Sequence, residues 1–320
     1  MRRGDQDLPG VGDVRTGAQH RRRPAVTSSP LSSFGMDTIT LAGPLETKLA
    51  VMKAAGFSQV MLKSDDLCGH PQGVDAAQAA VRASGLRTTG FQVLRDFEGL
   101  PAPLHAYKIE IAKAMLRLCA GLGGDVLLVC SSTSPHASED REHLARDLRK
   151  LAMLALPLGI RIAYEALSWG RTINEFPDAW DIVCRADCPN LGLGIDAYHL
   201  FASATPLARL DELVAEKIFL VQLSDFMWQH TASFEERKAT ARSFRVFPGE
   251  GVHSHELSEL VLRLDALGYR GDYSFEVFND DYVNLPPPMV AERARASALW
   301  LAEDVLRLPA PLPVGPAVAE

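Results

Sequence analysis

"IRIAYEALSWGRTINEFPDAWDIVCRADCPNLGLGID", residues 160–196, contains two short apolar stretches that each lead to a carboxylate. The first, RIAYEAL (161–167), reaches Glu165, and the second, LGLGID (191–196), ends at Asp196. Between them, FPDAWDIVCRA (176–186) has the apolar spacing of a helix. The stretch therefore predicts a strand–helix–strand unit whose two strands carry acidic side chains to the same edge of a sheet.

The same alternation recurs along the chain from Thr38 onward, with glycines such as Gly56, Gly85 and Gly268 suited to end helices. We expect strands at 38–43, 59–63, 87–94, 125–132, 161–167, 191–196, 217–225 and 272–278. We expect helices at 46–56, 75–85, 104–123, 141–156, 176–186, 206–216, 254–268 and 287–308. Eight strands alternating with eight helices predict an α/β fold, a single (β/α)8 TIM barrel. The rival is an open doubly wound sheet, whose dinucleotide-binding variant needs a G-x-G-x-x-G motif that LAGPLETK (41–48) lacks.

Both ends of the chain differ in composition from its middle. The first 35 residues hold six arginines and three aspartates without apolar periodicity. We interpret residues 1–35 as a disordered basic extension, with Met36 as an alternative start of translation, and residues 36–308 as the barrel domain. An organelle presequence is a weaker alternative. Residues 309–320 are rich in proline and predict a flexible tail.

Composition and charge narrow the class of protein. The chain is 47% hydrophobic with a formal net charge of −7, which argues against a dedicated binder of nucleic acid or anionic membrane. No apolar run approaches the roughly 18 residues of a membrane helix. The five cysteines form no C-x-x-C pair, as is typical of reduced thiols. We therefore expect a cytoplasmic protein without a nucleic-acid or membrane partner, and a homo-oligomer is compatible with the sequence.

Four successive predicted strands end on oxygen-bearing side chains: Glu165, Asp196, Gln222 and Glu276. In a TIM barrel the active site is built at these carboxyl ends. Any one of the carboxylates alone would be interpreted as a helix cap or the partner of an arginine. Three of them at one rim would repel one another without a cation. Three carboxylates and an amide oxygen suit one divalent metal ion, Mg²⁺, Mn²⁺ or Co²⁺.

Three further side chains follow predicted strand ends. His199 lies three residues past Asp196 and is a candidate general acid or base, although a lone histidine is more often structural. Arg95 and Arg245 are candidates for binding an anionic substrate, although loop arginines are usually only solvated. Neither the G-x-S-x-G motif of serine hydrolases nor a phosphate-binding G-x-x-x-x-G-K-[ST] loop occurs.

Six segments carry a resemblance to a known family: FQVLRDFEG (91–99), YEALSWGR (164–171), DAYH (196–199), VQLSD (221–225), FRVFPGEG (244–251) and SFEVFND (274–280). They resemble the xylose isomerase-like superfamily of sugar phosphate isomerases and epimerases, and within it the bacterial 3-dehydroshikimate dehydratases. Gln222 supports the narrower resemblance, because sugar and inosose isomerases of the superfamily generally have histidine at that position.

The resemblance implies roles for particular residues. Glu165, Asp196, Gln222 and Glu276 would bind the metal, with His199 and Glu276 in proton transfer. Arg95, Ser243 and Arg245 would face a small anionic hydroxy-ketone. The implied reaction is dehydration of 3-dehydroshikimate to protocatechuate through an enolate. The alternative is an isomerase or epimerase of a keto-sugar or inosose, or an inosose dehydratase, which uses the same enediolate chemistry.

The chain departs from the family pattern at two places, and both are expected to bear on substrate choice. Thr172 stands where the family usually has histidine, and KSDDL (63–67) lacks a glutamate that the family tends to carry. Two other classes remain as rivals. A DNA-repair endonuclease on a similar barrel would need a histidine-rich zinc cluster and a basic face. A non-catalytic ligand-binding protein would not need four intact ligand positions.

Overall fold

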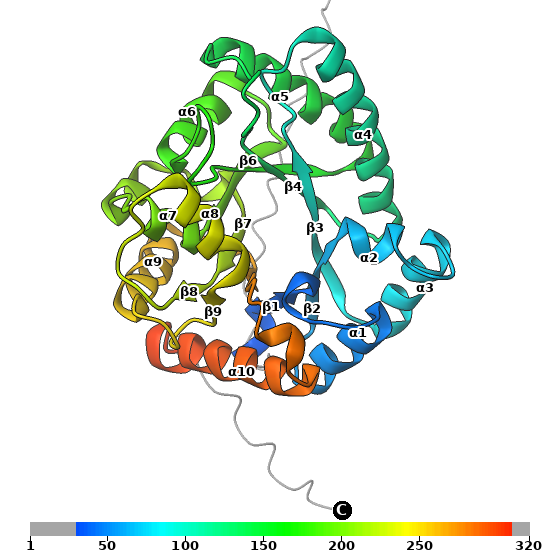
Figure 1. Ribbon diagram of the computed structural model, residues 1–320, viewed down its shortest axis with the longest axis vertical. Helices are drawn as coiled ribbons and strands as arrows, with labels where there is room; N and C mark the ends of the chain where they lie inside the picture. Colours follow the sequence, from blue (N-terminus) through cyan, green and yellow to red (C-terminus); the bar gives the residue numbers. More distant parts are fainter. Residues whose placement is uncertain (1–29, 309–320) are drawn as a thin grey trace, which may run out of the picture.

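Eight parallel strands form a closed barrel surrounded by helices (Figure 1). The computed structural model describes residues 30–308. Around the barrel the strands follow the order β1-β10-β7-β6-β5-β4-β3-β2. The predicted (β/α)8 barrel is therefore confirmed. Among the described residues, no helix combines the length and apolar character needed to cross a membrane.

The barrel strands are β1 (Phe34–Asp37), β2 (Gln59–Lys63), β3 (Arg87–Arg95), β4 (Val126–Cys130), β5 (Arg161–Glu165), β6 (Leu191–Asp196), β7 (Ile218–Leu223) and β10 (Tyr273–Phe275). A separate antiparallel pair consists of β8 (Asp225–Phe226) and β9 (Arg245–Val246). The helices are α1 (Leu45–Ala54), α2 (Ser64–Cys68), α3 (Val74–Ser84), α4 (Ala102–Gly121), α5 (Arg141–Ala155), α6 (Phe176–Ala186), α7 (Ala197–Ala202), α8 (Phe234–Ser243), α9 (Ser254–Leu267) and α10 (Pro287–Leu299). A π-helical turn at Trp300–Val305 follows α10.

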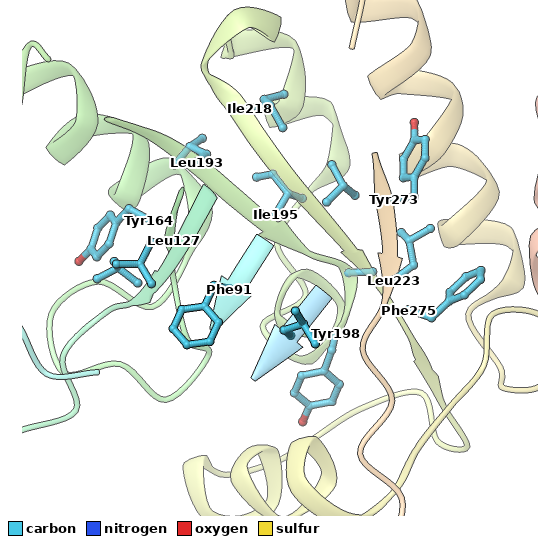
Figure 2. Close-up of a cluster of buried hydrophobic side chains, with 14 of the residues drawn as sticks. Phe91, Leu127, Tyr164, Leu193, Ile195, Tyr198, Ile218, Leu223, Tyr273 and Phe275 are labelled. Atoms are coloured by element: carbon cyan, nitrogen blue, oxygen red, sulfur yellow. The ribbon is translucent and has the colours of Figure 1, made fainter. Parts of the chain in front are cut away.

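Two apolar clusters stabilise the barrel, one outside and one inside the ring of strands. The larger cluster joins strand side chains to the helices, and Figure 2 shows some of its strand members, including Tyr164, Leu193 and Tyr273. The smaller cluster contains only strand residues: Met61, Val126, Leu128, Ala163 and Leu220. Burying such a side chain contributes roughly 1.5–3 kcal/mol, so these layers are the main source of stability.

The inner cluster determines where the polar strand ends lie. Side chains alternate between the two faces of a strand, so residues two apart share a face. Glu165 follows Ala163 by two residues, and Gln222 follows Leu220 by two residues. Both therefore point into the barrel, above the apolar layer and at its carboxyl rim.

The first strand lies four residues earlier than the sequence predicts. β1 begins at Phe34, whereas Thr38–Thr40 forms a 3-10 turn. Phe34 is fully buried, and its register opposite Tyr273 closes the barrel. The domain boundary predicted at residue 36 is therefore too late, because residues 30–35 belong to the fold. The remainder of the predicted extension (1–29) and the tail (309–320) lie outside the described residues.

The connections on either side of β7 also differ from the prediction. The helix expected at 206–216 is replaced by 3-10 turns at Leu207–Glu212 and Ala215–Lys217. The helical residues of this connection come earlier, in α7, because the Asp196 side chain caps it by accepting a hydrogen bond from Tyr198 N at 2.9 Å. After β7, the pair β8–β9 holds α8 beside the barrel mouth (Figure 1). Sequence reasoning did not predict α8.

Candidate active site

Three buried carboxylates meet at the carboxyl rim of the barrel: Glu165, Asp196 and Glu276. Potential ligand atoms of Glu165, Asp196 and His199 all lie within 4.8 Å of one another. Arg245 links Glu276 to this group, because its Nη1 lies 2.7 Å from Asp196 Oδ2 and 3.1 Å from Glu276 Oε2. Gln222 joins them from the neighbouring strand, where it pairs in register with Asp196.

The charges in this cluster do not balance. Three ionised carboxylates and the one guanidinium of Arg245 leave two negative charges. Burial raises the pKa of Glu165 well above its ordinary value, and the nearby Asp196 and Glu276 add to the effect. Burial likewise raises the pKa of Glu276 to about 7, although Arg245 opposes the shift. The anionic forms are therefore disfavoured here, and a divalent cation would supply the missing charge.

A metal ion fits this cluster only if some of its oxygen atoms are available as ligands. Two of them are available. Glu165 Oε1 and Gln222 Oε1 are buried without a hydrogen-bond partner among the described residues. Their companion atoms are held: Cys130 Sγ donates to Glu165 Oε2 at 2.9 Å, and Gln222 Nε2 donates to Asp37 Oδ2 at 2.8 Å. An unmet buried polar atom costs about 1–3 kcal/mol. These oxygens are the type that Mg²⁺ and Mn²⁺ prefer, so the residues fit such an ion.

His199 is buried beside Asp196, and its hydrogen bonds define its tautomer. The backbone N–H of Ser168 donates to His199 Nδ1 at 3.1 Å. Burial lowers the pKa of His199 to about 3, so the ring is neutral. With Nδ1 as acceptor, the proton of a neutral ring must be on Nε2, which lies 3.6 Å from Asp196 Oδ2. His199 therefore offers a hydrogen-bond donor, and its one lone pair is already in use.

The family of the chain follows from comparison with known proteins. A family model described as a xylose isomerase-like TIM barrel matches residues 49–303, which include every carboxylate of the cluster. The chain belongs to this family. The prediction made from its sequence motifs is confirmed at this level.

Two curated relatives and one solved structure are similar to this chain over most of its length. A 3-dehydroshikimate dehydratase of Pseudomonas aeruginosa is 38% identical over 269 residues, which are 83% of this chain and 41% of the relative. A protein of the same name from Pseudomonas putida is 35% identical over 275 residues, 85% of this chain and 42% of the relative. The structure of a xylose isomerase-like TIM barrel/4-hydroxyphenylpyruvate dioxygenase fusion protein is 33% identical, with a TM-score of 0.80, over 87% of this chain and 44% of that chain. The chain thus spans less than half the length of these relatives.

A cavity of about 440 Å³ opens beside the carboxylate cluster. Glu165, His199, Arg245 and Glu276 all contribute to its lining. Its volume lies in the range of small-molecule sites, roughly 300–1,000 Å³. The cluster is therefore accessible to a small ligand, although its carboxylates are buried.

Cationic side chains from three segments line the same cavity: Lys63 at the end of β2, Arg95 at the end of β3 and Arg242 in α8. Lys63 Nζ lies 3.4 Å from Asp65 in a partly exposed pair. Arg95 is exposed, and its guanidinium makes no hydrogen bond or ion pair within residues 30–308. The lining of the cavity therefore combines these positive charges with carboxylates of the acidic cluster.

Two of the predicted substrate-facing residues lie differently from what the sequence suggests. Arg245 lines the cavity, but its Nη1 already binds Asp196 and Glu276, and its Nε donates to Ala241 O at 2.9 Å. Ser243 is not among the cavity-lining residues, whereas its neighbour Arg242 is.

Sequence reasoning also missed several residues of the site: Asp37, Lys63, Gln92, Cys130 and Arg242. Lys63 left a detectable signal, since it ends the predicted strand 59–63, and Gln92 lies in the FQVLRDFEG segment (91–99). The departure from the family pattern at Thr172 lies outside the main cavity, in a small void that it shares with Glu98. The departure after β2 does reach the main cavity, through Lys63 and Asp65.

Proposed function

We propose that the chain is a divalent-metal-dependent lyase that dehydrates 3-dehydroshikimate to protocatechuate. The observation that carries the proposal is the pair of free, buried oxygens of Glu165 and Gln222 beside a cavity lined with cations. A substrate with both a ketone and a carboxylate has one group for a metal at the acidic cluster and one for the cations. The names of the two Pseudomonas relatives support this choice of substrate.

The mechanism assigns binding to two sets of residues, the acidic cluster and the cations of the cavity. Glu165, Asp196, Gln222 and Glu276 would hold the metal. When bound, the metal supplies Lewis-acid stabilisation of negative charge on the ketone oxygen. Arg95 and Lys63 bind the substrate carboxylate by charge-assisted hydrogen bonds. Arg245 keeps the Asp196 and Glu276 carboxylates in position and offsets part of their repulsion.

Proton transfer is assigned to Glu276. Its carboxylate takes the proton from the carbon next to the ketone, and the electron pair of that C–H bond forms the enolate. Expulsion of the β-hydroxyl as water then uses the same proton, returned by the Glu276 carboxylic acid. His199 Nε2–H donates a hydrogen bond to a substrate oxygen, and tautomerisation of the remaining ketone completes the aromatic ring.

The direct test is to incubate the purified protein with Mn²⁺ and 3-dehydroshikimate. We expect the ultraviolet absorbance of a catechol acid to appear, and chromatography to identify protocatechuate as the product. A keto-inosose tested under the same conditions should give no such product. If 3-dehydroshikimate remains unchanged with Mg²⁺, Mn²⁺ and Co²⁺ in turn, the proposal is wrong.

Replacing Lys63 or Arg95 by methionine should weaken substrate binding more than catalysis. Each change removes a cation that faces the substrate carboxylate, so we expect KM to rise about 10-fold or more, with a smaller effect on kcat. Steady-state kinetics on each variant measure both parameters. Lys113→Met is the matched control, because Lys113 pairs with Glu110 on the exposed face of α4. Unchanged KM in both cavity variants would contradict the assignment.

A further inference from the structure

Asp37 is a fully buried carboxylate at the end of β1 that no sequence motif pointed to. Within the described part of the chain it forms no ion pair with a lysine, arginine or histidine. A buried carboxylate is costly unless hydrogen bonds satisfy it. Its neighbours must therefore explain why it is present.

Three neutral donors from three other strands converge on Asp37. Gln222 Nε2 of β7 donates to Oδ2 at 2.8 Å, and Gln92 Nε2 of β3 donates to the same oxygen at 2.9 Å. Ser274 Oγ of β10 donates to Oδ1. Both oxygens of Asp37 are thus engaged by protein donors, unlike those of Glu165 and Gln222, which each leave one oxygen free. This arrangement makes Asp37 an anchor for other side chains.

The bond between Asp37 and Gln222 determines which end of the glutamine amide faces the acidic cluster. Gln92 Nε2 and Gln222 Nε2 both donate to Oδ2 of Asp37 while Ser274 Oγ donates to Oδ1, so the NH₂ group of Gln222 faces the carboxyl group. The amide oxygen, Oε1, then points away from Asp37 and is the atom left without a partner. A flipped amide would place two oxygens against each other and an NH₂ group toward the cation.

We propose that Asp37 is a positioning residue that holds the Gln222 amide with its oxygen toward the metal. The inference rests on the proposed role of Gln222 as a metal ligand. It explains how an amide, whose two ends are nearly the same in size and shape, becomes a dependable oxygen ligand. It also explains why a carboxylate without a cationic partner is kept at this position.

The first experiment measures Mn²⁺ binding to the full chain by titration calorimetry after removal of bound metal. Asp37→Asn keeps the size of the side chain but can face Gln222 with either an oxygen or an NH₂ group. Loss of such a supporting hydrogen bond typically weakens metal binding by about 10–100-fold, and we expect a loss in that range. Asp225→Asn is the matched control. Asp225 is equally buried, but it accepts from Phe226 N and His253 Nδ1, away from the cluster.

For a second variant, Gln222→Glu, the proposal predicts a change in Mn²⁺ affinity opposite to the one expected from the added ligand charge alone. Gln222→Glu supplies an additional anionic ligand, which on its own should strengthen Mn²⁺ binding. With Asp37 in place, however, the new carboxylate would face another carboxylate across the 2.8 Å contact, so we expect weaker binding. In the double variant that combines Asp37→Asn with Gln222→Glu, the introduced asparagine can donate to the introduced glutamate. Binding should therefore recover relative to either single variant.

The outcomes separate the inference from the function on which it rests. Weakened binding in both single variants, recovery in the double variant and unchanged affinity in Asp225→Asn would support the role of Asp37. Wild-type affinity in Asp37→Asn, or tighter binding in Gln222→Glu, would overturn it while leaving the metal site intact. Absence of Mn²⁺ binding to the unmodified chain would refute the metal site itself, and the inference with it. If Asp37→Asn does not fold, the direction of the change in Mn²⁺ affinity in Gln222→Glu decides between these outcomes.

Discussion

Replacing Glu276 by glutamine is expected to lower kcat for 3-dehydroshikimate by about 10³-fold, within the range for loss of a general acid or base. Glutamine has the same shape and keeps an oxygen that can bind a metal, but it cannot take a proton from carbon. His199 cannot replace it, because its Nδ1 lone pair accepts from Ser168 N. The measurement is steady-state turnover at saturating Mn²⁺, with Mn²⁺ binding to the variant checked by calorimetry.

Glu98→Gln is the matched control for this experiment. Glu98 is also a buried carboxylate near the rim, and burial likewise raises its pKa to about 7. It accepts from Ser132 N at 2.6 Å and Tyr164 Oη at 2.9 Å, and it does not line the main cavity. We expect Glu98→Gln to retain turnover within a few-fold. Near wild-type turnover in Glu276→Gln would show that another group removes the proton.

The sequence predicts the parts of the site that depend on periodicity. Alternation along each strand and the regular succession of strands and helices are local properties, so they place Glu165, Asp196 and Gln222 at one rim without knowledge of packing. Asp37 follows the same rule, but it was hidden by an error of four residues in the first strand. Strand boundaries are set partly by tertiary burial, here the packing of Phe34 against Tyr273, which a single sequence does not reveal.

The remaining features depend on contacts between distant segments. Arg245 was expected to face the substrate, and only the folded chain brings its guanidinium to within 2.7 Å of Asp196. Arg242 is an ordinary surface cation in the sequence, and only the folded chain brings it to the same cavity as Lys63 and Arg95. The tautomer of His199 depends on a backbone N–H from another loop, a contact for which no residue pattern exists.

Removal of divalent metal with EDTA should abolish turnover, and addition of Mg²⁺, Mn²⁺ or Co²⁺ should restore it. The reason is the charge imbalance of the acidic cluster, where burial raises the pKa of both Glu165 and Glu276. Metal binding should also stabilise the fold, by about 2.7 kcal/mol of unfolding free energy when free Mn²⁺ is 100 times its Kd. Thermal unfolding with and without Mn²⁺ measures this gain.

The affinity for Mn²⁺ should in addition depend on pH in a defined direction. Without metal, Glu276 has a pKa of about 7, so below that pH it is protonated and the metal must displace its proton. Affinity should therefore fall as pH decreases below 7, by about tenfold per pH unit for each proton released. Calorimetry in buffers of different ionisation enthalpy counts the protons directly. Full turnover by protein shown by mass spectrometry to be free of metal would rule out a metal-dependent reaction, whereas pH-independent Mn²⁺ affinity would place the ion away from Glu276.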